Sequence, residues 1–553
     1  MIYFPPKKHM MERILPMTKK LLKLYLMLLF SLFIFIFHVQ YASCSDDIIL
    51  FDDITCLKNS DLEVGTMVKT SGYQSSNDGN GATYIIISNP TSDIDNVNII
   101  PIQNNKFAKL VTNDAKPLND GGVRNLVQLD PYAPTITQLR NSFAPQQIFY
   151  FSTAGSDNND GLSPNYPKQN PIPYILAGNC QCLLKSGDIF QFDSSIKTGS
   201  NLIISTYGGK KRAAFSFIQT TDSTLNLLDS QNDIYSVSIN AGSNGVGWIS
   251  IDGAINWKRL LNNNLINENE YYYDSNQNNV IIKSKLNLEG KKLRYAINSN
   301  GINISNQSNV ILENIELSGS GLHGISIAYS SNVLIQNCYV HDIGGGLKST
   351  DGVKYGNGIQ IWASDCNNIA VYKNIVTDCF DAGITAQVSN VQYANSSNLY
   401  FLNNLVVRCN YGFESFHYSP TYYVKNVFIS NNIFYDSKDI TNGYRFTKYS
   451  KDYTAHLCLW SYNNSNSSFI FENNIGFKTQ ISAISYSGVS SVVPPIVFLN
   501  NTLISSNTAI KNPNQYTGDS NQYLIVTDSS EYSQYEEKIK NLINNYNLSR
   551  IIY

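Results

Sequence analysis

Residues that can transfer protons or bind sugars recur at comparable places between positions 320 and 420. One chemistry that fits them is a lyase reaction, which needs a base and groups that neutralise a uronate carboxylate. The candidate bases are Lys354, Tyr355, His323, His341, Arg408 and His417. The candidate neutralising amides are Asn357, Gln360 and Gln387.

A second chemistry, glycoside hydrolysis, needs two carboxylates on either side of the scissile bond. Asp381 and Glu414 stand at near-equivalent places of adjacent repeats, which favours such a pair, and Asp351 and Asp378 are reserve candidates. His341, Asp378 and Arg408 are also predicted to lie in one row. They fit an acid–base group and, equally well, a ladder of ion pairs at a corner of the fold.

These candidates are spaced by a repeat of asparagines and apolar residues between positions 309 and 503. In each copy an alternating apolar run is closed by asparagine, at 314, 337, 374, 404, 432, 474 and 501. Alternation is typical of strands, and a repeat of a few tens of residues indicates a solenoid. Asparagine suits the bends because it tolerates the left-handed backbone conformation. We therefore predict an all-β parallel β-helix whose coils stack about 4.8 Å apart.

A second strand in each coil starts with glycine and an apolar residue, at Gly324, Gly358, Gly383 and Gly412. Alternation sends every second side chain outward. The expected outward rows are Ser326, Gln360, Thr385 and Glu414, and beside them Ala328, Trp362, Gln387 and Phe416. The loop 344–355 would bring Lys354 and Tyr355 to the rim of this face. We predict a groove that binds a sugar chain, and its substrate-binding residues are Asn357, Gln360, Trp362, Gln387, Phe416 and His417.

The N-terminus has the pattern of a signal peptide. Lysines precede an apolar run from Leu24 to Val39, and small residues follow it. Alternatives are an uncleaved membrane anchor and a lipoprotein lipidated at Cys44. Each of them places the protein outside the cell or on its surface. The net charge of −2 gives no case for nucleic acid or an anionic membrane surface as a partner.

The cysteines do not form a zinc-binding pattern. Cys338 takes the place of Ile315, Ile375 and Leu405 in other coils, which predicts a buried apolar role. Cys379 and Cys409 occupy equivalent places in adjacent coils and are expected to stack, with a disulfide between them left open.

The chain divides into five segments. We expect a signal peptide or anchor over 1–45, a small β module over 46–111, a linker over 112–146, the β-helix over 147–510 and a C-terminal cap over 511–553. The linker holds one short helix near 135–141. The cap contains an amphipathic helix over 531–548, because apolar residues recur there at helical spacing.

Two segments resemble known families. Residues 148–192 contain, in order, a strand, Gly155-Ser156-Asp157 with Asp160-Gly161, a short helix and Gly187-Asp188. This order resembles the first coil of secreted β-helix proteins of the pectin-lyase-like superfamily. Residues 46–111 resemble the small module ahead of the β-helix in phage tailspikes and glycan depolymerases. The resemblance implies a right-handed β-helix and a polysaccharide ligand, without the substrate or bond type, and it gives no support for a homotrimer.

No cofactor is firmly implied. Asp157 and Asp160 could bind calcium, but a tight turn explains both, and we favour the turn. We predict a secreted or surface polysaccharide-active protein, an enzyme rather than a binding module, with a lyase slightly preferred over a hydrolase. The alternative is a non-catalytic glycan-binding or adhesin-like protein.

Overall fold

The computed structural model describes most of residues 49–115, 132–347, 354–438 and 454–504, with shorter gaps inside these ranges, and residues 508–511 and 523–526. The predicted signal segment, the reserve carboxylate Asp351 and the predicted C-terminal helix over 531–548 lie outside the described residues. The chain divides into two compact units, Met1–Pro131 and Tyr132–Tyr553, which are described separately.

The first unit contains a five-stranded sheet in the order β1-β2-β3-β5-β4. Helix α2 (Ile54–Lys58) packs into its core through Ile54 and Leu57, against Val68, Tyr84 and Ile86. The strands are β1 (Ile49–Phe51), β2 (Met67–Thr70), β3 (Asn80–Ile87), β4 (Ile99–Pro101) and β5 (Phe107–Ala115). The small β module expected over 46–111 lies within this unit.

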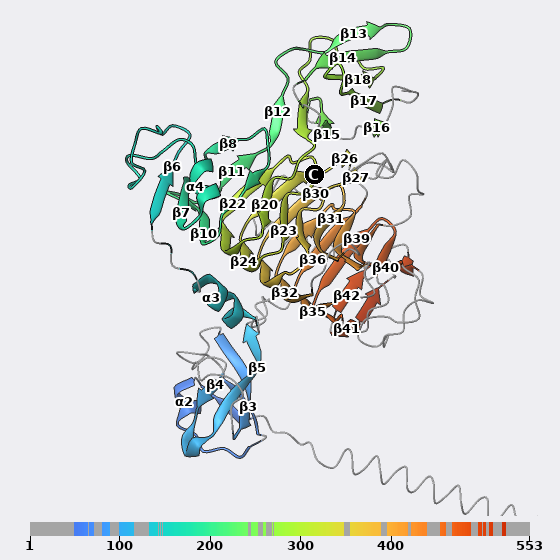
Figure 1. Cartoon of the computed structure of the whole chain (residues 1–553). Coiled ribbons are helices and arrows are strands. Elements are labelled where there is room, and N and C mark those ends of the chain that lie inside the picture. Colours follow the sequence, from blue (N-terminus) through green and yellow to red (C-terminus); the bar gives the residue numbers. More distant parts are fainter. Residues whose placement is uncertain are drawn as a thin grey trace, which may run out of the picture. The chain divides into compact units, whose positions relative to one another are not determined.

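The second unit is a parallel β-helix with three long sheets, in which each coil adds one strand to each sheet (Figure 1). We call them sheets I, II and III. Sheet I consists, in spatial order, of β6 (Ile148–Phe151), β7 (Cys180–Lys185), β10 (Leu202–Tyr207), β21 (Ser308–Glu313), β24 (Ser331–Gln336), β29 (Asn367–Tyr372), β32 (Ser396–Leu402), β35 (Val424–Ser430), β38 (Phe469–Glu472) and β41 (Ile496–Leu499).

Sheets II and III follow the same coils. Sheet II consists of β8 (Ile189–Gln191), β11 (Ala213–Ser216), β22 (Ile315–Ser318), β25 (Tyr339–Ile343), β30 (Ile375–Cys379), β33 (Leu405–Val407), β36 (Ile433–Ser437), β39 (Ile475–Thr479), β42 (Asn501–Ile504) and β44 (Tyr523–Val526). Sheet III consists of β9 (Ile196–Lys197), β20 (Ile302–Ser305), β23 (Ile325–Ala328), β28 (Ile359–Trp362), β31 (Ala382–Val388), β34 (Tyr411–His417), β37 (Ala455–Trp460), β40 (Ser482–Ser487) and β43 (Thr508–Lys511). Their inward side chains form one continuous apolar core.

Two helices cover parts of the β-helix. Helix α3 (Ala133–Asn141) lies in the segment 112–146 and packs Ile136 and Leu139 onto the outer face of sheet I. Arg140 anchors it there through both carboxylate oxygens of Glu313, at 2.9 and 3.0 Å. Helix α4 (Ile172–Ala177) packs against β7 and buries Ile175 in the core of the first coils.

The asparagines form two separate ladders, one at the start and one at the end of the sheet I strands. The outer ladder lies at the start of the sheet I strands from β7 to β35, where the Nδ2 atom of each asparagine donates to the Oδ1 atom of the asparagine one coil earlier, at 2.8–3.3 Å. Its members are Asn179, Asn201, Asn309, Asn332, Asn368, Asn398 and Asn426. All except Asn179 thus donate toward the N-terminal end of the β-helix.

The inner ladder lies at the bend between sheets I and II and is buried. Each member donates its Nδ2 and backbone N–H to the Oδ1 of the next, from Asn374 through Asn404, Asn432 and Asn474 to Asn501. The residue before each of the first four adopts the left-handed conformation, as Lys373 and Asn403 do with φ of 54° and 55°. Where a coil has two asparagines, the first therefore makes the bend and the second joins the ladder.

This division corrects part of the predicted place of Cys338. Cys338 is in line with Ile315, as predicted, but Tyr339 and not Cys338 lies opposite Ile375 in sheet II. The backbone N–H of Cys338 donates to Oδ1 of Asn374 at 2.9 Å, so Cys338 occupies a ladder position. Its predicted burial is confirmed. Cys379 and Cys409 are buried as well, and neither forms a disulfide.

An excursion of antiparallel strands leaves the coils after β11 and returns before β20 (Figure 1). A three-stranded sheet joins β12 (Ile218–Thr220), β19 (Arg294–Ile297) and β15 (Val246–Ser250). A five-stranded sheet joins β13 (Asn226–Asp229), β14 (Ile234–Ser238), β18 (Asn279–Lys283), β17 (Glu270–Asp274) and β16 (Lys258–Leu260).

Trp248 and a group of glycines fasten the excursion to the coils. Trp248 packs with Ala296 and Phe380, and its indole N–H donates to the carbonyl oxygen of Asp342 at 2.8 Å. A Cβ atom at Gly247 would lie 2.4 Å from Cα of Gly321 and 2.9 Å from the carbonyl oxygen of Gly344. Only glycine allows the backbones to approach this closely.

Candidate functional site: the outer faces of sheets II and III

The outer face of sheet III has the two predicted rows. The strand registers place Ser326, Gln360, Thr385 and Glu414 opposite one another, and likewise Ala328, Trp362, Gln387 and Phe416. The next strand, β37, extends them with Cys458 and Trp460. The sequence pattern does not mark Cys458 or Trp460, because β37 begins with Ala455-His456 and lacks the glycine at which the other sheet III strands start. Alternating apolar residues in 455–460 were the available signal.

The two rows differ in exposure. Gln360 and Glu414 are each only 5% exposed and Thr385 is fully buried, although all three point away from the core. Trp362, Gln387, Phe416 and Trp460 are half-buried. Aromatic ring surface is therefore accessible in the second row, where the rings of Phe416 and Trp460 lie 6.3 Å apart.

Glu414 is held by its neighbours. The Nε2 atom of Gln387 donates to Oε2 of Glu414 at 2.7 Å, and the Thr385 hydroxyl donates to the Glu414 carbonyl oxygen at 2.8 Å. A hydrogen bond to a carboxylate in a site of low dielectric is stronger than one in water. The Gln387–Glu414 pair thus forms a fixed polar group beside the aromatic row.

His323 and Tyr355 meet on the side of sheet III where strands β23 and β28 begin, whereas Trp362 lies where β28 ends. Their rings lie 6.0 Å apart, edge to face, and both side chains are half-buried. Tyr355 and Lys354 form β27 (Lys354–Tyr355), which pairs with β26 (Gly346–Leu347). The backbone N–H of Gly345 donates to the carbonyl oxygen of Tyr355 at 2.9 Å. The loop 344–355 thus brings Tyr355 to sheet III, as predicted, while the side chain of Lys354 lies outside the described residues.

Asn357 is a structural residue, contrary to its predicted role as a neutralising amide. It is fully buried. Its Nδ2 donates to Oε1 of Gln360 at 2.8 Å and its Oδ1 accepts from the backbone N–H of Ala382 at 3.1 Å. Its own backbone N–H donates to Nδ1 of His323 at 3.2 Å. The side-chain amide of Asn357 thus links β28 to the start of β31, while its backbone N–H contacts His323 ahead of β23.

Asp381 and Glu414 do not occupy near-equivalent positions. Thr385 lies opposite Glu414 and Ala382 opposite Tyr411, so Asp381 lies four residues before the partner of Glu414. Four residues of strand span about 13 Å. The two carboxyl groups of glycosidases lie about 5 to 9.5 Å apart. The strand positions therefore do not favour the predicted Asp381–Glu414 pair.

The predicted row of His341, Asp378 and Arg408 lies on sheet II, away from sheet III, and its register is wrong by one residue. His341 lies opposite Thr377. The residue in line with Asp378 and Arg408 is Asp342, and all three have left-handed backbones with φ of 51° to 57°. The error arose because Asn337 is a bend residue whereas Asn374 is a ladder residue, so counting from the last asparagine mixed two positions.

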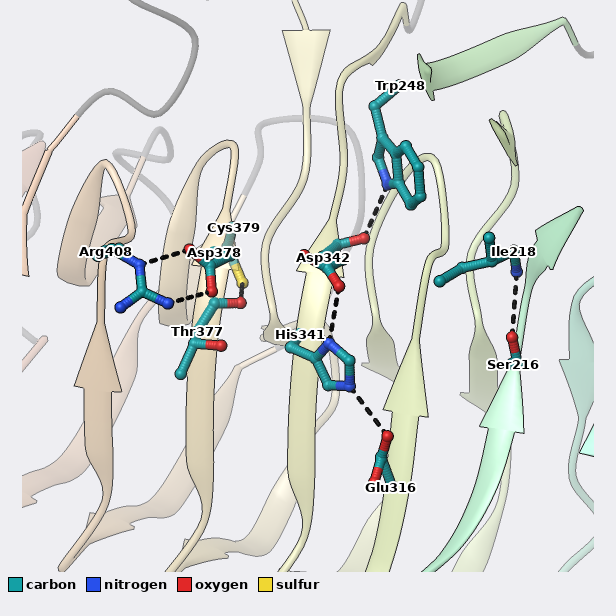
Figure 2. A network of polar contacts seen from close by, with 10 residues as sticks. All are labelled: Ser216, Ile218, Trp248, Glu316, His341, Asp342, Thr377, Asp378, Cys379 and Arg408. Carbon is teal, nitrogen blue, oxygen red and sulfur yellow. Dashed lines mark hydrogen bonds and ion pairs between the residues drawn. The ribbon is translucent and has the colours of Figure 1, made fainter. Parts of the chain in front are cut away.

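His341 sits between two carboxylates instead (Figure 2). Its Nδ1 lies 2.8 Å from Oδ2 of Asp342 and its Nε2 lies 3.2 Å from Oε1 of Glu316. Burial lowers the pKa of His341, but the hydrogen bonds to Asp342 and Glu316 outweigh it and raise the pKa to about 9. The ring is therefore an imidazolium at neutral pH and is poorly suited to act as a base.

Asp378 and Arg408 form a two-bond ion pair (Figure 2). Nε of Arg408 donates to Oδ1 of Asp378 at 2.7 Å and Nη2 donates to Oδ2 at 2.6 Å. Burial lowers the pKa of Arg408, but the Asp378 carboxylate more than offsets this and leaves it raised. Of the two hypotheses for this row, these contacts favour the ion-pair ladder over acid–base chemistry.

His417 is packed into the structure. It is buried, its Nε2 lies 2.9 Å from the carbonyl oxygen of Tyr422, and burial lowers its pKa. A neutral ring that donates to a backbone carbonyl explains these contacts. His417 thus does not reach the accessible aromatic row.

Asp157 and Asp160, in the first coil, each stabilise a tight turn by accepting backbone hydrogen bonds. Oδ1 of Asp157 accepts from the backbone N–H groups of Gln169 and Asn170 at 3.1 and 2.8 Å. Oδ1 of Asp160 accepts from that of Leu162 at 2.9 Å. Within the described part of the chain, no group of three or more His, Cys, Asp or Glu is placed to hold a metal ion.

Comparison with known proteins supports the fold. Residues 215–386 and 283–459 match the family model of the right-handed β-helix region. Together with the parallel sheets, this confirms the right-handed parallel β-helix expected from the pectin-lyase-like resemblance. The search of curated proteins found no match. Among the described residues, no helix is long and apolar enough to cross a membrane.

Solved structures give distant similarities only. XylC in complex with xylose is 9% identical, with 66% of this chain and 70% of that chain covered and a TM-score of 0.38. A tailspike, gp49 of Acinetobacter baumannii bacteriophage Fri1, described as a capsular polysaccharide depolymerase, is 13% identical, with 86% and 70% covered and a TM-score of 0.27. The pectate lyase Pel9A is 12% identical, with 71% and 78% covered and a TM-score of 0.31. Similarity at this level carries no information on activity.

Proposed function

We propose that this protein acts outside the cell or on its surface and binds a polysaccharide along the outer face of sheet III. The observation that carries the proposal is the row Trp362, Gln387, Phe416 and Trp460, which combines accessible rings with the amide of Gln387, itself bonded to the Glu414 carboxylate of the adjacent row. Trp362 and Phe416 are two coils, about 10 Å, apart. Rings stack on sugar faces while amides bond hydroxyls, and such a mixed surface is typical of ligand sites.

The protein cleaves the polysaccharide by β-elimination beside His323 and Tyr355, where the strands of the same sheet begin. Elimination fits better than hydrolysis because Asp381 and Glu414 are set too far apart along the strands. His323 accepts a hydrogen bond at Nδ1, so its neutral ring carries its proton on Nε2. Five residues of strand, about 17 Å, separate the level of His323 from that of Trp362, so a glycan of several sugars reaches both.

In this mechanism Tyr355, as phenolate, removes the proton beside the uronate carboxyl, and the C–O bond to the leaving sugar breaks. The phenol of Tyr355 then gives this proton to the leaving oxygen, to which the Nε2–H of His323 donates a hydrogen bond, so Tyr355 returns to the phenolate and His323 stays neutral. General acid and base groups of this kind each contribute about 10²- to 10⁴-fold to rate. Lys354, beside Tyr355 in the chain, remains a proposed base as well.

The test is incubation of the purified protein with a panel of acidic and neutral polysaccharides. We expect new reducing ends together with the ultraviolet absorbance of an unsaturated uronate. Reducing ends without that absorbance would overturn elimination in favour of hydrolysis. Trp362→Ala should weaken binding of the same glycan without changing the product.

The second candidate is a glycan-binding or adhesin-like protein without catalysis. One observation favours it: the predicted catalytic residues are divided between sheets II and III, and Glu414 is already bonded to Gln387. Retention of the protein on an immobilised glycan, with no cleavage of any member of the panel, would establish binding alone.

A further inference from the structure

A cavity of about 530 Å³ opens at the N-terminal end of the β-helix, apart from the face described above. It is formed by β6, by helix α4 with the turn that follows it, and by the aspartate-rich segment of the first coil. Its lining residues are Phe149, Asp157, Lys168, Asn170, Pro173, Tyr174, Ala177, Gly178, Asn179 and Cys180.

Two aromatic rings form one wall. The rings of Phe149 and Tyr174 lie 4.5 Å apart at 54°, and both are half-buried. Nζ of Lys168 lies 5.7 Å from the centre of the Tyr174 ring. The cavity thus has accessible ring surface, with a cation fixed beside it.

The outer asparagine ladder ends at this cavity. Each later asparagine donates Nδ2 to the Oδ1 of the one before, and the last acceptor in this direction is Asn179, at 2.9 Å from Asn201. Within the described residues, the Nδ2 of Asn179 has no acceptor, and the preceding strand β6 adds no described asparagine to the ladder. Amides bonded in a chain polarise one another, so this terminal N–H₂ is a strengthened donor.

Two further polar groups have bonding capacity to spare. Oδ1 of Asn170 accepts from the backbone N–H of Ile172 at 3.0 Å, and no described group accepts from its Nδ2. The Oδ1 of Asp157 is occupied by two backbone N–H groups. Its Oδ2 accepts no hydrogen bond from the described residues, so one carboxylate oxygen remains for a ligand donor.

We propose that this cavity is a second, non-catalytic sugar-binding site that holds one pyranose residue. Its ring would stack on Tyr174, its hydroxyl oxygens would accept from Asn179 and Asn170, and one hydroxyl would donate to Asp157. A ring with both donors and acceptors on its edge matches this set better than an anion, which Asp157 repels. The proposal does not depend on cleavage at sheet III.

The test compares two asparagine-to-glycine variants of the outer ladder. Asn179 and Asn426 both have left-handed backbones, with φ of 53° and 55°, so glycine preserves the conformation at either position. Asn179→Gly removes the donor in the cavity. Asn426→Gly removes the same kind of rung at the other end of the ladder and is the matched control.

Binding of neutral xylo-, cello- and malto-oligosaccharides to the whole protein is measured by calorimetry, with Trp362→Ala as background to suppress sheet III. We expect at least one of these sugars to bind, and Asn179→Gly to weaken it by about tenfold, the loss of one good hydrogen bond. Asn426→Gly should bind as the parent does. Equal affinities of the two glycine variants, or no binding of any sugar in this background, would overturn the proposal.

Discussion

The Nδ1 atom of His323 accepts a hydrogen bond from the backbone N–H of Asn357, at 3.2 Å, and this contact leaves the proton of the neutral ring on Nε2. His323→Gln should therefore remove the hydrogen bond that the ring donates to the leaving oxygen in the proposed elimination. We expect kcat to fall by about 10²- to 10³-fold with little change in KM. His341→Gln, on sheet II, is the control and should leave kcat close to that of the parent. An unchanged rate for His323→Gln would exclude this residue from the reaction.

The charged His341 makes stability depend on pH. Its pKa of about 9 in the folded protein exceeds the value of about 6.5 in the unfolded chain. The stabilisation is thus fully present below about pH 6.5 and is lost as the pH rises through 9. The shift corresponds to about 3 kcal/mol. Thermal unfolding between pH 6 and 10 should show the parent losing its advantage over His341→Gln across this window. Parallel curves would contradict the assignment.

The inner ladder should be sensitive to truncation. Nδ2 of Asn404 donates to Asn432 and to the carbonyl oxygen of Val371, and its Oδ1 accepts from Asn374. Asn404→Ala leaves these buried groups without partners and should cost about 3–5 kcal/mol of unfolding free energy, measured by urea denaturation. Asn398→Gly, in the outer ladder, should cost about 1 kcal/mol or less. Similar losses for both variants would show that burial of the ladder is not what matters.

The glycine junction should couple the excursion to the site. Gly247→Ala places a Cβ 2.4 Å from Cα of Gly321 and 2.9 Å from the carbonyl oxygen of Gly344. The next residue, Gly345, donates its backbone N–H to the carbonyl oxygen of Tyr355, so the added methyl group disturbs the segment that positions Tyr355. We expect a lower melting temperature and a fall in cleavage rate. The control is Gly290→Ala, where a Cβ meets nothing within 4 Å and the backbone φ of +78° costs about 1–2 kcal/mol. The junction would have no positioning role if both variants cleaved equally well.

The β-helix and sheet III could be predicted because they depend on local patterns. The glycine at the start of four sheet III strands marks one register position. The predicted rows through Glu414 and Phe416 therefore agree with the strand register. Sheet II was harder, because two kinds of asparagine serve two purposes at one bend. Only the contacts show that Asn337 makes a bend whereas Asn374 joins the ladder.

Other features of the site depend on contacts between distant segments. Nothing in the sequence near Asn357 indicates that its side-chain amide bonds to Gln360 and to the backbone of Ala382. The burial of Gln360 and Glu414 could not be predicted either. The alternation of apolar and polar residues shows which way a side chain points, but it does not show which groups cover that side chain. The cavity beside Asn179 arises where the coils begin, which a repeat pattern cannot mark.

The inner ladder also bears on how the length of this protein can change. Every rung from Asn374 to Asn474 presents the same donors to the next coil, and Asn404 to Asn501 present the same acceptors to the one before. A gene duplication that adds one whole coil between two of them would recreate both sets of bonds at the new boundaries. The ladder thus lets the β-helix grow or shorten by single coils that extend the same core, and the outer face of sheet III would lengthen with them.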